Sequence, residues 1–79
     1  MIRHMTAEEL RAIARAGASF SMDPRTFELE EVRAILRALT PGATVTLYHT
    51  RYLTVPELTQ LARAAPGQVV FEMDGPPTS

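Results

Sequence analysis

The chain has 79 residues, of which 46% are hydrophobic and 22% are charged, and its net charge is −1 at pH 7. These values predict one small globular domain and exclude an intrinsically disordered chain. The near-neutral charge argues against a dedicated nucleic-acid binder, which would need a basic face. We find no apolar run of about 18 to 20 residues and no signal-peptide pattern, so we expect a cytoplasmic protein with no membrane partner.

The basic side chains exclude several kinds of chemistry. All 8 are arginine, and neither lysine nor cysteine occurs. The chain therefore has no thiolate nucleophile, thiolate metal site, phosphate-binding P-loop lysine or Schiff-base lysine. Such an arginine-rich composition is typical of a GC-rich genome, although arginine also suits bidentate recognition of phosphate or carboxylate. No motif indicates catalysis, so we expect no cofactor and no metal.

The first predicted helix begins after Thr6, because Thr6 and Glu9 have the spacing of a capping box. Gly17 is a helix stop signal, and residues 18–22 (ASFSM) alternate as a strand does. The apolar residues predicted to share the inner face of this unit are Leu10, Ile13, Ala14, Phe20 and Met22.

In the second predicted helix, Glu31 is equivalent to Glu9, but Glu28 occupies the capping position that Thr6 occupies in the first helix. A glutamate is a weaker cap, so this helix is expected to begin as early as Thr26. Gly42 follows the helix, and residues 43–49 (ATVTLYH) form the second predicted strand. Its predicted inner-face residues are Val32, Ile35, Leu36, Leu39, Val45 and Leu47.

The third unit repeats the capping box at Thr54 and Glu57, and Gly67 follows its helix. Residues 68–73 (QVVFEM) form the third predicted strand. The apolar residues predicted to share its inner face are Leu58, Leu61, Ala62, Val69, Phe71 and Met73.

One eight-residue motif therefore occurs three times, as ELRAIARA at 9–16, EVRAILRA at 31–38 and ELTQLARA at 57–64. Alternating helices and strands predict an α/β fold with a three-stranded parallel sheet in the order 1-2-3. Right-handed crossovers place all three helices on one face. Residues 6–74 form this domain, residues 1–5 are an extension that is either native or added by cloning, and residues 75–79 are a flexible tail. The predicted core contains Leu10, Ile13, Phe20, Val32, Ile35, Leu36, Val45, Leu47, Leu58, Leu61, Val69 and Phe71.

The other face of the predicted sheet is polar, which is unusual because parallel sheets are normally covered on both faces. The residues predicted to point there are Ser19, Ser21, Thr44, Thr46, Tyr48, Gln68 and Glu72, with Val70 as the apolar exception. We interpret this face as the binding surface for a protein partner. The predicted binding residues are Ser21, Thr44, Thr46, Tyr48 and Glu72, together with Arg25 and Arg51 in the adjoining loops.

Charged side chains follow the strands, which suggests a second kind of site. Asp23, His49 and Asp74 each come directly after a predicted strand. Ligands of open α/β sheets bind beyond the carboxyl ends of the strands, so these three residues are a candidate anion, metal or acid–base site of a small enzyme. The alternative interpretation is that Asp23-Pro24 and Asp74-Gly75 are ordinary turns.

Arginines recur on the outer helix surface and suggest a third hypothesis. Arg15, Arg37 and Arg63 are equivalent in the three units, and Arg11 and Arg33 form a second row. Such a stripe would suit a nucleic-acid adaptor. The alternative is a solvated surface, since arginine at a helix carboxyl terminus is what the helix dipole favours.

The first strand also offers an exposed sheet edge, because residues 18–22 carry no charge and no proline. Pairing of two such edges across a two-fold axis would give a homodimer.

Repeated E-Φ-x-x-Φ-A-R-A helices, each followed by glycine and a short strand, resemble small bacterial α/β-repeat proteins of unknown function. They also resemble the leucine-rich-repeat plan of one strand and one helix per unit, without its L-x-x-L-x-L-x-x-N signature. The resemblance covers roughly residues 6–74, implies a binding surface and carries over no catalytic residue. The expected function is therefore a non-catalytic protein-interaction module that binds through its open polar sheet face or its edge strands.

Overall fold

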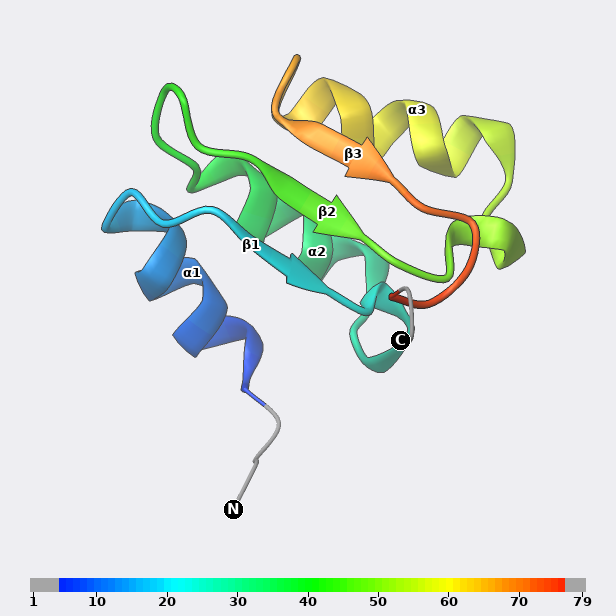
Figure 1. The fold of residues 1–79 in the computed structure, drawn as a ribbon, viewed down its shortest axis with the longest axis horizontal. Helices are drawn as coiled ribbons and strands as arrows, with labels where there is room; N and C mark the ends of the chain where they lie inside the picture. Colours follow the sequence, from blue (N-terminus) through cyan, green and yellow to red (C-terminus); the bar gives the residue numbers. More distant parts are fainter. Residues whose placement is uncertain (1–4, 77–79) are drawn as a thin grey trace.

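The computed structural model describes residues 5–76, and the expectations for residues 1–4 and 77–79 lie outside this range. A helix and a strand alternate three times along the chain (Figure 1). The helices are α1 (Ala7–Arg15), α2 (Leu29–Arg37) and α3 (Val55–Ala64), and the strands are β1 (Phe20–Met22), β2 (Val45–Leu47) and β3 (Val69–Phe71). Short 3-10 turns η1 (Pro24–Thr26) and η2 (Thr50–Tyr52) precede α2 and α3.

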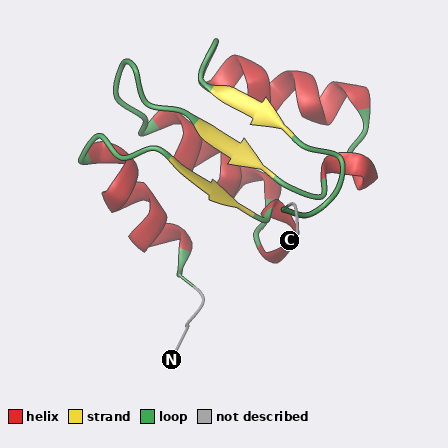
Figure 2. Cartoon of the chain, viewed as in Figure 1, coloured by secondary structure: helices red, strands yellow, loops and turns green. Residues whose placement is uncertain are grey.

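The three strands form a parallel sheet in the order β1-β2-β3, and the helices lie together behind it (Figure 2). The register aligns Phe20 with Val45 and Val45 with Val69. The α/β repeat, the strand order and the single helical layer predicted from the sequence are therefore confirmed. Within residues 5–76, every helix is too short or too polar to cross a lipid bilayer.

The predicted capping boxes set the starts of α1 and α3. Thr6 Oγ1 accepts the N–H of Glu9 at 3.2 Å, and Glu9 Oε1 accepts the N–H of Thr6 at 2.9 Å. Thr54 and Glu57 exchange the same two bonds at 3.3 and 2.8 Å. These bonds satisfy amides that a helix start otherwise leaves without an intrahelical partner.

The prediction that the second helix begins as early as Thr26 is wrong. Thr26 belongs to η1, where its Oγ1 donates to the Asp23 carbonyl at 3.2 Å. Phe27 then adopts an extended conformation, with φ −127° and ψ 157°, so it separates η1 from α2. The helix begins at Leu29, after a Glu28 whose N–H donates to Glu31 Oε1 at 2.9 Å.

The core lies between the helices and the inner face of the sheet. Its largest fully buried apolar side chains are Val32, Ile35, Leu36, Val45, Leu47 and Leu61. Leu10 and Met22 are also buried, whereas Phe20, Val69 and Phe71 on the edge strands are buried only in part. Most of the predicted core is therefore correct.

Two predicted core residues, Ile13 and Leu58, are only half-buried and stand outside the central cluster. Both lie in the end helices, where a neighbouring unit covers one side only. Their pattern positions are equivalent to buried positions of α2, so the sequence pattern does not distinguish them.

Each strand is shorter than the alternating pattern predicts. Beyond Phe71 the chain leaves the sheet, so Met73 is exposed instead of facing the helices. Gln68 was expected on the polar face, but its Nε2 donates to the carbonyls of Thr40 at 2.7 Å and Ala43 at 2.9 Å. This amide connects the loop before β2 to the start of β3.

Candidate functional site

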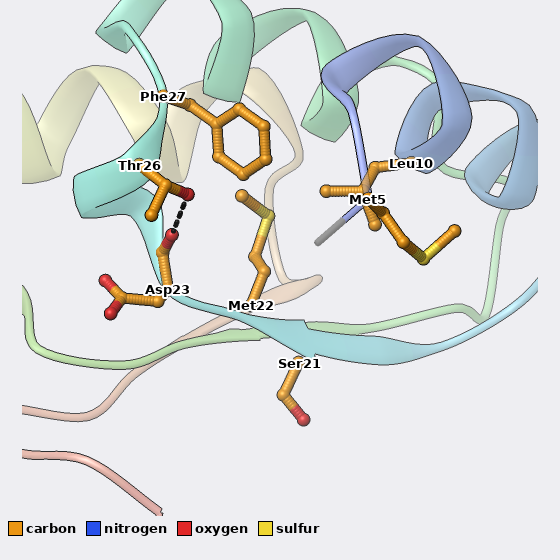
Figure 3. Close-up of a pocket in the computed structure, with 7 residues that line it drawn as sticks. All are labelled: Met5, Leu10, Ser21, Met22, Asp23, Thr26 and Phe27. Carbon is orange, nitrogen blue, oxygen red and sulfur yellow. Dashed lines mark hydrogen bonds between the residues drawn. The ribbon is translucent and has the colours of Figure 1, made fainter. Parts of the chain in front are cut away.

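The face of the sheet opposite the helices is open, as predicted. Ser21, Thr46 and Val70 stand in one row across the three strands. In Figure 3, Ser21 points away from the helices, whereas Met22 points toward Leu10 and Phe27. Val70 is 44% exposed, so the row ends in an apolar spot. We call Ser21, Thr46, Val70 and the adjoining Tyr48 the open face.

The remaining predicted residues of this surface have different environments. Thr44 and Glu72 are exposed just beyond the strand ends. Ser19, in contrast, has a structural role, because its Oγ accepts the N–H of Thr44 at 3.0 Å. Sequence alternation did not reveal this bond, which joins the chain before β1 to the chain before β2.

The structure brings Asp23 and His49 together at the carboxyl ends of the strands. Asp23 Oδ2 lies 4.0 Å from His49 Nε2, which is too long for a hydrogen bond. Arg25 forms a two-pronged contact with the same carboxylate, at 3.0 Å from Nε to Oδ1 and 2.7 Å from Nη2 to Oδ2. The arginine predicted to contact a partner thus already neutralises Asp23.

Asp74 meets His49 through its backbone, while its carboxylate is engaged elsewhere. The N–H of His49 donates to the Asp74 carbonyl at 3.0 Å, and Arg51 Nη2 donates to Asp74 Oδ1 at 2.9 Å. The fully buried Thr50 adds a bond from its Oγ1 to the Glu72 carbonyl at 2.9 Å. These contacts fasten the chain after β3 to the chain after β2.

His49 is the one described non-glycine residue with a positive φ, at 55°. Histidine tolerates this left-handed conformation better than most residues, and here it joins β2 to η2. Gly75 packs over its ring, since a Cβ on Gly75 would lie 2.9 Å from His49 Cε1. The sequence showed no sign of this contact.

This arrangement pairs each aspartate carboxylate with an arginine, so it leaves few charged groups available for catalysis. Asp23 with Arg25, and Asp74 with Arg51, form two separate ion pairs. Among residues 5–76, no three His, Asp or Glu side chains converge in a way that could hold a metal ion. The hydrogen bond from Arg25 holds the pKa of the Asp23 carboxyl below its usual value of 3.8.

The lowered pKa of Asp23 predicts a pH-dependent stability. A carboxyl with a depressed folded-state pKa stabilises the fold above its unfolded pKa, and this stabilisation is lost as the pH falls through the folded value. We expect the free energies of unfolding of wild type and D23N, measured in urea, to differ most above about pH 5 and to converge as the pH falls through the folded-state pKa of Asp23, which lies below 3.8. In an R25A background the D23N substitution should produce a much smaller pH-dependent difference. Parallel wild-type and D23N curves over the whole range would contradict this account.

Two shallow hollows lie between successive helix starts. The first has a volume of about 260 Å³ and opens between α1 and η1 (Figure 3). Its lining residues are Met5, Leu10, Ser21, Met22, Asp23, Thr26 and Phe27. The second, of about 240 Å³, lies between the starts of α2 and α3 and includes Val32, Tyr52 and Leu53. The first hollow is mainly apolar, whereas Glu28, Tyr52 and Glu57 give the second a mixed lining.

The predicted arginine stripe divides into two rows. Arg11 and Arg33 form i,i+3 ion pairs with Glu8 at 3.2 Å and with Glu30 at 2.6 Å. Arg15, Arg37 and Arg63 are exposed at the helix ends, where the helix dipole favours a positive charge.

The geometry therefore presents one uncovered sheet face, with ion pairs beside it at the strand ends. Helices cover only the opposite side of the sheet, so the fold leaves this face uncovered. Comparison with known proteins found no matching family model, no similar curated protein and no similar solved structure.

Proposed function

We propose that this chain is a non-catalytic protein-interaction module that binds a protein partner through the open face. The observation that carries the proposal is the single helical layer, because a parallel sheet normally has both faces covered. A second layer would require apolar residues at the positions of Ser21 and Thr46. These hydroxyl side chains favour a surface that remains solvated until a partner binds.

The charged cluster beside the sheet supports binding over the enzymatic alternative. Arg25 and Arg51 are each paired with a carboxylate, so the cluster offers little net positive charge to a substrate anion. Asp23 is likewise occupied by Arg25, which limits it as a proton acceptor for His49. The same ion pairs can instead open and re-form with groups of a partner at the rim of the open face.

The residue types on the open face define the chemistry of the partner. Tyrosine and arginine are enriched at binding hot spots, and Tyr48 and Arg51 lie close together in the chain after β2. Ser21 and Thr46 offer hydroxyls to polar groups, and Val70 offers an apolar spot. We infer a partner surface with hydrogen-bonding side chains beside a small apolar spot.

The test begins by immobilising the chain, capturing proteins from a lysate of the source organism and identifying them by mass spectrometry. Binding of each candidate is then measured with purified variants. Tyr48→Ala is expected to weaken binding by about 1 kcal/mol or more. Arg51→Ala should weaken it similarly, while the melting temperature of each variant stays close to that of wild type.

Matched controls use the same residue types away from this face. Tyr52→Ala and Arg37→Ala should leave the affinity unchanged, because Tyr52 lines the hollow between the starts of α2 and α3 and Arg37 ends α2. If Arg15→Ala and Arg37→Ala abolish binding while Tyr48→Ala does not, the arginine stripe is the site and the proposal fails. A captured nucleic acid whose affinity falls steeply with salt would favour the adaptor hypothesis.

A further inference from the structure

The three units of the chain have equivalent helix positions, so their burial can be compared directly. Aligning Glu9, Glu31 and Glu57 defines three apolar positions in each helix. Position one holds Leu10, Val32 and Leu58, position two holds Ile13, Ile35 and Leu61, and position three holds Ala14, Leu36 and Ala62.

Position two is covered only where another unit comes before it. Ile35 and Leu61 are fully buried, but Ile13 in the first unit is partly exposed. The sheet order shows that α1 stands at the β1 end of the molecule, with no described unit beyond it. Position two therefore faces the preceding unit.

Positions one and three show the opposite dependence. At position one Leu10 and Val32 are buried, and at position three Ala14 and Leu36 are buried. The equivalent residues of the last unit, Leu58 and Ala62, are partly exposed. Val55 extends the pattern. It is 75% exposed, whereas its equivalents Ala7 and Leu29 pack against the core. These positions face the following unit, and within residues 5–76 no unit follows the last repeat.

Each end of the molecule therefore exposes the surface that, inside the chain, contacts a neighbouring unit. The exposed side of α1 is one half of such a contact, and the exposed side of α3 is the other half. The outer side of α3 presents a stripe of Val55, Leu58 and Ala62, and the outer side of α1 presents Ile13. We propose that copies of this chain stack head-to-tail, with α1 and β1 of one copy seated on α3 and β3 of the next. The occupant of each end is a second copy, because the same contacts already join successive units within the chain.

The sheet edges match in the same way. Phe20 N–H and the Met22 carbonyl point toward β2, so the N–H and carbonyl of Ser21 point to the free edge. On β3, the Gln68 carbonyl and the Glu72 N–H point toward β2. The N–H and carbonyl groups of Val69 and Phe71 therefore point to the free edge of β3.

In the stack, Ser21 of the next copy would lie between Val69 and Phe71, as Val70 lies between Val45 and Leu47 within the chain. This parallel pairing keeps the inner-face side chains of both copies on the helical side. It would also cover the half-buried Val69, Phe71 and Phe20 at the two edges.

Such an interface is heterologous, so it produces an open chain of copies or a closed ring, unlike a two-fold dimer. It leaves the open face uncovered and sets the open faces of successive copies side by side. The inference therefore does not depend on the proposed binding function.

The first test is sedimentation analysis of the full chain over a range of concentrations. The average mass of wild type should rise with concentration and more than double, without a plateau at two copies. Val55→Glu places a charge on the outer side of α3, at a site so exposed that the fold does not depend on it. We expect this variant to stay monomeric, while the matched Gln60→Glu control on α3 assembles like wild type.

The second test blocks the other end. Ile13→Arg should also be monomeric, while Ala12→Arg, an exposed neighbour on α1, should assemble. Circular dichroism checks the fold of each variant. If Ile13→Arg does not fold, Ser21→Pro takes its place, because proline removes the N–H of Ser21 that points to the free edge.

Mixing the two monomeric variants gives the decisive result. Each retains one intact end, so an equimolar mixture should form dimers of one copy of each and nothing larger. A wild type that remains monomeric, or a mixture that does, overturns the proposal. A wild-type dimer that Val55→Glu leaves intact would instead support the two-fold pairing of the 18–22 edges.

Discussion

Replacing Ile35 with alanine is expected to lower the free energy of unfolding by about 2 to 5 kcal/mol. Ile35 is fully buried in the middle of α2, so the truncation leaves a cavity that the surrounding side chains fill only in part. A domain of this size buries only about 60% of the surface that its unfolded chain exposes, so its total stability is small. Urea unfolding followed by circular dichroism should show the loss, and the variant should be largely unfolded at moderate temperature.

Leu58→Ala is the matched comparison, because the apolar pattern of the sequence treats Leu58 and Ile35 alike. Leu58 is partly exposed in α3, so its truncation should cost clearly less than that of Ile35 when the protein is dilute and monomeric. Equal losses for the two variants would show that the end helices are packed more tightly than this structure has them.

The replacement Gln68→Leu should lower the free energy of unfolding by about 1 to 3 kcal/mol. Its side-chain amide is the donor to the carbonyls of Thr40 and Ala43, and leucine cannot replace either bond. Because Ala43 is buried, water has little access to the carbonyl left behind. Thermal and urea unfolding should agree on the loss.

Gln60→Leu is the control for this change, since Gln60 is exposed on α3. It should alter the stability by no more than about 0.5 kcal/mol. If Gln68→Leu proved as mild as Gln60→Leu, Gln68 would be a surface residue of the polar face, as strand alternation alone predicts.

Local patterns in the chain specify most of the architecture. Thr6 with Glu9, and Thr54 with Glu57, mark helix starts correctly because a capping box joins residues only three apart. The repeated apolar spacing and the short alternating strands were enough to predict a parallel sheet with one helical layer. Alternation likewise predicted that Ser21 and Thr46 lie on the uncovered face, since successive strand residues point to opposite sides.

Contacts between distant segments decided the rest. The approach of Asp23 to His49 depends on how β1 and β2 end beside each other. Gly75 meets the His49 ring only because the chain folds back after β3. Ile13 and Ile35 have the same local sequence pattern and different burial, because burial depends on whether a neighbouring unit covers the side chain, and only the assembled stack of helices and strands supplies that neighbour.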